Sequence, residues 1–318
     1  MSRTAAIVIG RNEGARLEAC LASMPPGLAA VVYVDSGSID GSVAAARAAG
    51  ALVVELDPAR PFTAARARNE GVAALSAAGH APDFLQFVDG DCTLVPGWVE
   101  TAAAFLETHP QAAVVCGRRR ERHPEASVYN RLCDREWDTP VGRARACGGD
   151  ALMRRAAFEA AGGFCGDLIA GEEPELCVRL RTAGWEVWRI DAEMTRHDAA
   201  MTRFGQWWTR ARRGGHAAAE GAALHGAAPE RHGVAQTRRA LVWGAALPAG
   251  ALGGALLTPW ALLLLAAYPA QVVRLARRKG GRQGDWEEAV FLTLGKLPEA
   301  LGVLRRALAR LGPAARQD

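Results

Sequence analysis

Two aspartates separated by one glycine, Asp89 and Asp91, directly follow a mostly apolar run at residues 84–88. The run is typical of a buried strand and places Asp89 at the strand's carboxyl end, where open α/β sheets bind their ligands. Residues i and i+2 of an extended segment point the same way, and Gly90 between them permits a close approach. Two carboxylates on one side suit Mg²⁺ or Mn²⁺ that holds a diphosphate. The alternative is an ordinary Asp-Gly turn after a strand.

The elements that must position these carboxylates alternate between strand and helix. Apolar runs at 5–9, 30–34 and 52–56 are each followed by a loop and a helical pattern, and the run at 84–88 continues the series. This alternation predicts an α/β fold with a mostly parallel sheet flanked by helices. Further helices are expected at 98–108, 151–161 and 173–183, strands at 112–116 and 185–190, and a substrate-facing excursion or surface loop at 117–149.

The composition limits the classes of protein. Of 318 residues, 50% are hydrophobic and 23% are charged, which indicates a folded protein with one catalytic-size domain and a smaller module. The net charge of +4 comes from arginine clusters near 118–122, 210–213 and 274–279. Such clusters either bind phosphates or an anionic membrane, or form solvated faces. No recognised nucleic-acid-binding motif accompanies them, so nucleic acid is not an expected partner.

The cysteines occur at irregular spacings, and none belongs to a CxxC pair. This pattern favours buried, reduced thiols in the cytosol over a zinc site or a disulfide framework. The first apolar run, 5–9, is too short for a secretory signal and is expected to be a strand. The seven cysteines are Cys20, Cys92, Cys116, Cys133, Cys147, Cys165 and Cys177.

A long uncharged segment, 240–273, dominates the last third of the chain. As one helix its 34 residues would measure about 51 Å, against a hydrocarbon thickness of about 30 Å. Two helices of about 17 residues that turn near Thr258 would measure about 25 Å each. Arginines flank both ends, and the positive-inside rule then places both ends in the cytoplasm, as a membrane hairpin requires. The alternative is a buried helical pair in a soluble protein.

Amphipathic segments flank this hairpin. Residues 201–219 mix aromatic residues with arginines, which predicts a helix at a membrane surface or an ordinary surface helix, and 222–237 is expected to be a linker or mobile loop. Residues 286–311 predict a helix that lies on the bilayer or packs on the catalytic domain. The expected organisation is a catalytic domain at 1–200, an amphipathic and linker region at 201–239, a membrane hairpin at 240–274, and a cytoplasmic amphipathic helix and tail at 275–318.

Several short motifs occur in order within residues 4–200. They are Ile9-Gly10-Arg11-Asn12-Glu13, Val34-Asp35-Ser36-Gly37-Ser38, Ala67-Arg68-Asn69-Glu70-Gly71, Asp89-Gly90-Asp91, Gly148-Gly149-Asp150 and Gly171-Glu172-Glu173-Pro174-Glu175-Leu176. In this order they resemble the family 2 inverting glycosyltransferases, which have the nucleotide-diphospho-sugar transferase (GT-A) fold. The resemblance implies a Rossmann-like α/β catalytic domain followed here by a C-terminal helical, membrane-associated segment.

The resemblance implies a donor site at the ends of the first strands. Glu13 and Asp35 would accept hydrogen bonds from the ribose and the base, and Arg68 would lie near the nucleotide. For Asp35 the alternative is capping of the following helix. The residues implied to bind the donor are Gly10, Asn12, Glu13, Asp35, Ser36, Gly37, Arg68, Asp89, Gly90 and Asp91.

A metal site and a general base are also implied. Asp91, assisted by Asp89, would bind Mg²⁺ or Mn²⁺, and His197 resembles a histidine that completes this site in some members. The alternative for a lone histidine is a surface or capping role. Glu173 stands where the family has its general-base aspartate, and Glu172 beside it is a rival. Both glutamates also suit the start of a helix, whose dipole they would complement.

The acceptor side is implied to include Gly149, Asp150 and Arg179. Asp150 departs from the family's usual asparagine, and Glu173 departs from its aspartate. Only these two departures favour a reading of a different class, a non-catalytic membrane scaffold that keeps the fold.

The sequence thus predicts a metal-dependent inverting glycosyltransferase at the cytoplasmic face of the cell membrane. Its donor would be a nucleotide-diphospho-sugar, and its acceptor a lipid-linked or cell-envelope glycan. The alternative acceptor is polyprenyl phosphate, with arginines of 118–122 or 210–213 as phosphate ligands.

Overall fold

The structure is a computed structural model that describes residues 3–311. It divides into an N-terminal unit, Met1–Ala200, and a C-terminal unit, Met201–Asp318. The expected tail at 312–318 and the side chain of Arg310 lie outside the described residues.

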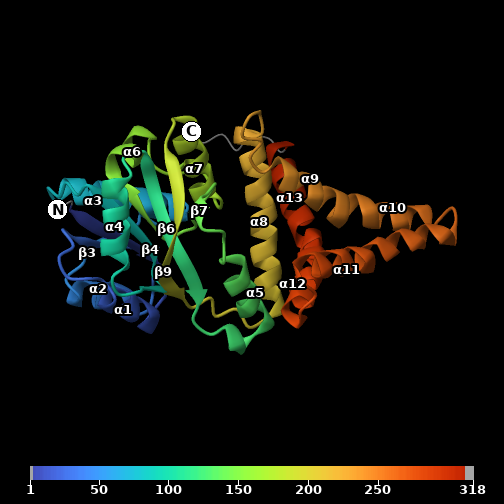
Figure 1. Ribbon diagram of the computed structural model, residues 1–318, viewed down its shortest axis with the longest axis horizontal. Coiled ribbons are helices and arrows are strands. Elements are labelled where there is room, and N and C mark those ends of the chain that lie inside the picture. The colour runs from blue at the N-terminus through green and yellow to red at the C-terminus, as the bar shows by residue number, and fades with distance from the viewer. Residues whose placement is uncertain (1–2, 312–318) are drawn as a thin grey trace. The chain divides into compact units, whose positions relative to one another are not determined.

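A mixed sheet forms the centre of the N-terminal unit (Figure 1). Its strands lie in the order β3-β2-β1-β4-β8-β6-β9-β5, and β7 pairs with β9. β1 pairs in parallel with β2 and β4, so the carboxyl ends of these strands meet at one edge, where Gly10 lies opposite Asp35 and Ile9 opposite Asp89. The strands are β1 (Thr4–Gly10), β2 (Val31–Asp35), β3 (Leu52–Glu55), β4 (Phe84–Asp89), β5 (Cys92–Leu94), β6 (Ala112–Glu121), β7 (Gly142–Arg143), β8 (Ala151–Arg154) and β9 (Glu186–His197).

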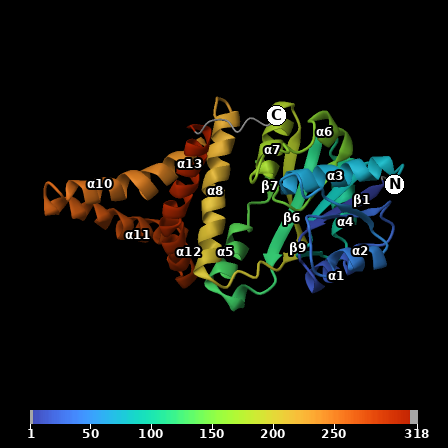
Figure 2. The same ribbon diagram turned by 180° about the vertical axis from the view of Figure 1, so that it is seen from behind.

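Helices cover this sheet. Helix α4 lies on the face seen in Figure 1, and α3 lies beside β1 on the face seen in Figure 2. Three rings, Phe87, Phe158 and Phe164, pack with centroids 5.3–5.4 Å apart in the core. The helices are α1 (Ala15–Ala22), α2 (Ser42–Ala48), α3 (Ala64–Ala77), α4 (Trp98–Thr108), α5 (Val128–Glu136), α6 (Arg155–Ala160) and α7 (Glu172–Thr182), with a short 3₁₀ turn at Pro124–Ala126.

The expected fold class is confirmed, but three segments differ from the prediction. The predicted helix at 151–161 begins as strand β8, because residues 151–154 pair antiparallel with β4 and β8 also pairs with β6. The predicted strand at 112–116 continues to Glu121, because its charged end pairs with β9. The polar segment after it forms helix α5 and β7 rather than a long loop. Long-range pairing therefore outweighs local propensity here.

The C-terminal unit is helical in its described part. Helices α8 and α13 cross at two glycines, since a Cβ on Gly215 would lie 2.0 Å from the Glu299 carbonyl oxygen, and one on Gly302 would lie 2.1 Å from that of Arg212. Arg306 forms an ion pair with Glu220 at 2.6 Å across the same helices. The elements are α8 (Phe204–His225), α9 (Val234–Leu241), a π-helical turn (Val242–Ala246), α10 (Leu247–Gly254), a 3₁₀ segment (Pro259–Ala266), α11 (Ala267–Lys279), α12 (Gln283–Leu294) and α13 (Lys296–Leu311).

The uncharged segment forms two helical limbs that lie side by side (Figures 1 and 2). The chain reverses near Thr258, where Leu256 and Leu257 are 88% and 91% exposed. Among residues 3–311, one helical stretch, Pro259–Lys279, is long and apolar enough to cross a bilayer. Little of it is buried in the protein.

Two elements of the C-terminal unit differ from the sequence expectation. Helix α8 continues to His225 and α9 begins at Val234, so the expected linker at 222–237 is shortened to a connection at residues 226–233. The expected single helix at 286–311 is broken at Gly295 into α12 and α13.

Candidate functional site

Asp89, the last residue of β4, is held between two arginines. Its Oδ1 accepts a hydrogen bond from Arg68 of α3 at 2.7 Å, and its Oδ2 lies 3.5 Å from Arg119 of β6. Burial alone would raise the pKa of Asp89, but the two guanidinium groups outweigh burial and lower it. Asp89 is therefore an ionised carboxylate with both oxygens engaged.

Arg68 joins this carboxylate to a second one. It donates to Glu172 Oε1 at 2.6 Å, at the start of α7, and only 3% of its side chain is exposed. A buried arginine between two carboxylates presents a rigid, planar donor set. Arg68 therefore bridges Asp89 and Glu172.

Asp150, whose side chain is fully buried, contacts both Asp89 and Arg119. Its Oδ1 accepts from the Asp89 backbone N–H at 3.0 Å, and its Oδ2 accepts from Thr195 at 2.8 Å and pairs with Arg119 at 2.7 Å. This ion pair explains why a carboxylate replaces the neutral asparagine seen in the motif, because it neutralises the buried Arg119.

Gly149 leaves the space that this cluster fills. A Cβ at Gly149 would lie 2.7 Å from Asp89 Oδ2 and 2.9 Å from an Arg68 nitrogen. No side chain fits there without displacing one of these groups, so the position requires glycine.

Asp91 faces a histidine. His197, at the end of β9, lies with Nε2 3.2 Å from Asp91 Oδ2 and Nδ1 3.7 Å from Glu121 Oε2. Burial lowers the pKa of His197, but the two carboxylates outweigh burial and raise it to about 9. Trp137 packs edge-on against the imidazole at 4.7 Å and beneath the Arg119 guanidinium at 5.4 Å.

The donor atoms around His197 fit a divalent metal. Asp91, Cys92 and His197 each offer a ligand atom within 4.8 Å of the others. The Glu121 carboxylate, 3.7 Å from Nδ1, lies where a metal-binding histidine usually has its outer partner. Asp89, in contrast, is engaged by arginines, so Asp91 and His197 are the better placed ligands.

The first two strand ends lie against each other at this edge of the sheet. Asn12 has a left-handed backbone (φ 57°), and its Oδ1 accepts from Ile39 N at 2.8 Å. Asp35 accepts from Tyr33 at 2.9 Å and from the N–H groups of Gly37 and Ser38 at 2.9 and 2.8 Å. Asp35 therefore orders its own loop and is not the cap of α2, which begins at Ser42.

The remaining predicted donor residues occupy the same strand ends. Gly10 ends β1, and its carbonyl oxygen accepts from Ser36 N at 3.0 Å. Gly90 N donates to the Ile9 carbonyl at 2.8 Å. Burial raises the pKa of Glu13, with a smaller contribution from Asp91, although Glu13 pairs with Arg16 at 2.7 Å.

Glu173 lies deeper than Glu172. It is 7% exposed, and its Oε1 accepts from the Cys147 backbone N–H at 2.5 Å and from the Cys177 thiol at 3.2 Å. Arg179, expected on the acceptor side, instead pairs with Glu175 and donates to the Gly163 carbonyl at 2.8 Å. The structure therefore places Arg179 in contacts between α7 and the segment after α6.

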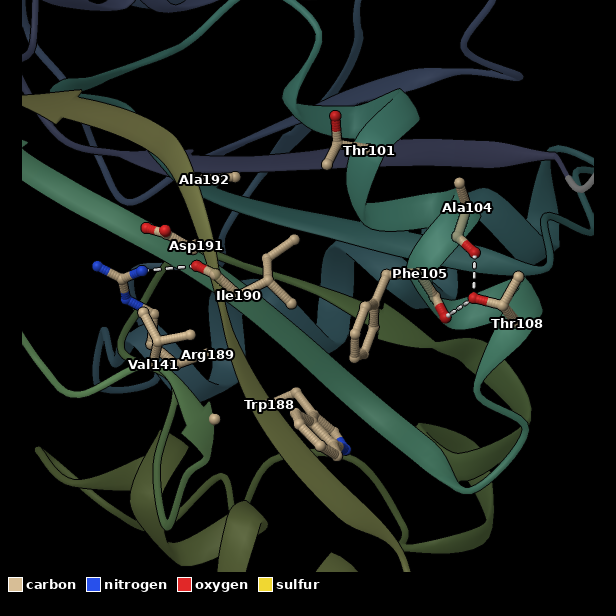
Figure 3. A pocket seen from close by; sticks show the side chains of 11 residues that line it. Thr101, Ala104, Phe105, Thr108, Val141, Trp188, Arg189, Ile190, Asp191 and Ala192 are labelled. Carbon is tan, nitrogen blue, oxygen red and sulfur yellow. Dashed lines mark hydrogen bonds between the residues drawn. The ribbon is translucent and has the colours of Figure 1, made fainter.

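A separate cavity of about 570 Å³ lies between α4 and β9 (Figure 3). Phe105 and Trp188 lie side by side in it, with ring centroids 5.5 Å apart, and Arg189 donates to the Ile190 carbonyl at 2.6 Å. None of the predicted site residues lines this cavity. It is not the site formed by Asp89, Asp91 and His197.

Arginines at 118–122 are already paired within the N-terminal unit. Arg118 contacts Asp134 at 3.1 Å, Arg120 contacts Glu193 at 2.6 Å, and Arg122 donates to Thr93 at 2.9 Å. These contacts leave the cluster less suited to bind an external phosphate than the sequence suggests.

Sequence reasoning missed Glu121 and Trp137, and it considered Arg119 only as one arginine of the cluster at 118–122. Arg119 and Glu121 lie two residues apart on β6. Residues at this spacing share a face of the strand, and this was the available signal.

The fold is that of the nucleotide-diphospho-sugar transferases with a GT-A fold. The family model described as glycosyl transferase family 2 matches residues 5–161, just under half of the chain, so these residues form a domain of that family.

Two solved structures have a similar fold. The mannosyltransferase PcManGT from Pyrobaculum calidifontis, in complex with GDP-Man and Mn²⁺, is 20% identical, with a TM-score of 0.64 over 95% of this chain and 87% of that one. Glucosyl-3-phosphoglycerate synthase from Mycobacterium tuberculosis, in complex with Mg²⁺ and UDP, is 19% identical, with a TM-score of 0.51 over 72% and 81%. At sequence identities this low, the structural similarity establishes a shared fold and no more.

Two curated proteins are similar in sequence. The succinoglycan biosynthesis protein ExoA of Rhizobium meliloti is 29% identical over 196 residues, 57% of this chain and 58% of ExoA. A TPR repeat-containing protein of Synechococcus elongatus is 30% identical over 133 residues, 42% of this chain and 31% of that protein. The chain thus spans less than two thirds of either relative.

Proposed function

We propose that the chain transfers a sugar from a nucleotide-diphospho-sugar to a lipid-linked or cell-envelope glycan acceptor, with inversion at the anomeric carbon. The observation that carries this proposal is the pairing of Asp91 with His197 at 3.2 Å, beside the arginine-bound Asp89 at the carboxyl edge of the sheet. The family membership and the fold support it.

The donor would lie across the ends of β1, β2 and β4. Loops at Gly10–Glu13 and Asp35–Gly37 would hold the nucleoside, and Arg68 would place Asp89 near the donor sugar and ribose. Asp35 is satisfied by its own loop, so it would shape the nucleoside site through the backbone as well as through its carboxylate.

Asp91 and His197 would bind Mg²⁺ or Mn²⁺. The ion would supply charge stabilisation to the leaving diphosphate. Glu121 would orient His197 from behind through Nδ1, while Trp137 fixes the plane of the ring. Both neighbours hold the imidazole so that Nε2 faces Asp91.

Glu173 would act as the general base and take a proton from the acceptor hydroxyl. Its motif position supports this role, and its Oε1 is held by the Cys147 N–H and the Cys177 thiol. Glu172 already neutralises Arg68 at 2.6 Å, and proton transfer to it would break that pair. Glu172 would therefore position Arg68 rather than accept the proton.

Membrane association would come from the hairpin around Thr258. The exposed leucines at its tip and the arginines at its base, Arg238, Arg239, Arg277 and Arg278, favour insertion from the cytoplasmic side. A membrane location fits an acceptor that is lipid-linked or part of the cell envelope. Polyprenyl phosphate is a less favoured acceptor, because the arginines at 118–122 are paired internally.

The direct test is binding and hydrolysis of a panel of nucleotide sugars with Mn²⁺ or Mg²⁺. We expect Asp91→Ala to lower the turnover by on the order of 1,000-fold, because it removes charge stabilisation that acts in the transition state. Glu173→Gln should lose turnover while donor binding remains, and Glu172→Gln should mainly weaken donor binding. If the wild-type protein neither binds nor hydrolyses any donor, the proposal fails. That result would favour the alternative, a non-catalytic membrane scaffold that keeps the fold.

Membrane association has its own test with lipid vesicles. Replacing Leu256 and Leu257 with lysine should abolish flotation with anionic vesicles, because it places charges at the apolar tip. The matched control is Ile169→Lys, an exposed apolar residue of the N-terminal unit. Complete extraction of wild type from membranes by salt without detergent would contradict the hairpin's insertion.

A further inference from the structure

Cys147, Glu173 and Cys177 bring two sulfur atoms and a carboxylate oxygen together inside the N-terminal unit. The two Sγ atoms are 3.8 Å apart, and Cys177 Sγ is 3.2 Å from Glu173 Oε1. All three ligand atoms lie within 4.8 Å of one another, and all three residues are buried. This cluster shares no residue with Asp91 and His197.

The spacing matches that of a metal site. Two thiolates bound tetrahedrally to one Zn²⁺ at about 2.3 Å lie about 3.8 Å apart. Glu173 and Cys177 are four residues apart on α7, so they lie on one face of the helix. Cys147, on the segment between β7 and β8, completes the set from the other side.

We propose that Cys147, Cys177 and Glu173 form a binding site for a thiophilic divalent cation such as Zn²⁺ or Cd²⁺. Binding breaks two S–H bonds, forms two metal–sulfur bonds and releases two protons to water, with no change in oxidation state. Glu173 supplies the third ligand, and a fourth position remains for water.

The metal-free cluster is already arranged for this exchange. The thiols contact each other and Cys177 donates to Glu173, so the ligand atoms are gathered before an ion enters. Cys147 is 9% exposed and the least buried of the three, so it marks the entry side.

Occupancy would also inhibit transfer. This consequence rests on the proposed function, because Glu173 is the proposed base and a metal-bound carboxylate cannot accept the acceptor's proton. Inhibition by Zn²⁺ or Cd²⁺ should therefore persist in excess Mg²⁺ and be reversed by a chelator.

The experiment titrates the full chain with Cd²⁺ in excess Mg²⁺ and follows the ultraviolet thiolate-to-cadmium charge-transfer band. We expect one Cd²⁺ per chain and the release of two protons. Cys147→Ser and Cys177→Ser should each weaken Cd²⁺ binding by more than roughly 100-fold, because loss of a direct thiolate ligand costs more than the 10–100-fold typical for loss of an outer partner. Cys165→Ser, which removes a thiol that belongs to neither candidate metal site, should leave the band unchanged.

Several outcomes overturn the proposal. These are a wild-type chain without the band, a band that survives in Cys147→Ser, and a Cys147–Cys177 disulfide in place of bound cadmium. If Cys177→Ser fails to fold, Cys147→Ser alone decides, because its side chain is nearest the surface. A band lost in the variants without any inhibition of wild type supports the metal site and counts against Glu173 as the base.

Discussion

The two units of the chain bury different things. The N-terminal unit buries charged side chains at its sheet edge: Arg68, Asp150 and Glu173 are 3%, 0% and 7% exposed. The C-terminal unit brings helix backbones together at Gly215 and Gly302 and leaves leucines at its hairpin tip in the open.

The buried charges and the contact glycines therefore have different roles, since the charges position a site and the glycines allow helices to pack. A buried ion pair adds little net stability, because the cost of removing two charges from water offsets their attraction. Backbones that meet at glycines gain dispersion contacts over many atoms at once. The charges of the N-terminal unit are therefore explained by positioning, and the glycines of the C-terminal unit by close contact.

The largest expected effect is that of removing Arg68. Arg68→Ala leaves Glu172 unpaired and leaves Asp89 with only the longer contact to Arg119, which should lower the free energy of unfolding by about 3–5 kcal/mol. The matched control is Arg47→Ala, whose pair with Glu55 is 61% and 59% exposed and should cost less than about 1 kcal/mol. Urea unfolding measures both, and equal losses would show that burial does not decide the value of these pairs.

A second prediction concerns geometry rather than charge. Gly149→Ala puts a methyl group 2.7 Å from Asp89 Oδ2 and should lower kcat/KM by roughly 100-fold by displacing the carboxylate. Gly166→Ala has no atom within 4 Å of the new methyl group and should keep full activity. Steady-state kinetics on one donor gives the answer; comparable rates for the two variants would mean that Asp89 need not be held in place.

In the C-terminal unit, adjacent glycines of α8 make a matched pair. Gly215→Ala forces a methyl group 2.0 Å from the Glu299 carbonyl oxygen and should destabilise the unit by about 1–3 kcal/mol. Gly214→Ala enters open space and should stabilise the helix by about 0.4–1 kcal/mol. Thermal unfolding of the full chain distinguishes them, and a shift of the same sign for both variants would refute the close crossing.

The remaining prediction is a pH dependence at His197, which changes gradually with pH. Its raised pKa, about 9 against 6.5, means that the charged ring stabilises the metal-free fold fully below pH 6.5 and that this contribution is lost as pH rises through about 9. A metal on Nε2 must displace that proton, so Mg²⁺ affinity should rise with pH, by at most about tenfold per unit, and level off near pH 9. Calorimetric titration measures it, and His197→Gln should flatten the profile.

Much of the N-terminal unit was predictable from the sequence. The run at 84–88 followed by Asp89 indicated a strand end with carboxylates, and β4 ends at Asp89. Helix α4 has the predicted bounds, Trp98–Thr108. Local periodicity carries this information, because each of these elements shows one clear pattern.

The predicted site residues were only partly brought together. Arg68, Asp89, Gly149, Asp150 and Glu172 meet in one cluster, and Asp91 meets His197 beside it. Arg119, Glu121 and Trp137 enter only through the pairing of β6 with β9 and the position of α5. The sequence around these residues does not predict that β6 pairs with β9.

The sequence by itself determined the order of the motifs, the strand that ends at Asp89 and the uncharged segment at 240–273. Only the tertiary structure decided that 151–154 is a strand, that Glu172 is tied to Arg68 while Glu173 meets two cysteines, and that α12 and α13 separate at Gly295. The physical reason is common to all three. Each depends on atoms far apart in the chain, and local propensity weighs less than the pairing and packing those atoms provide.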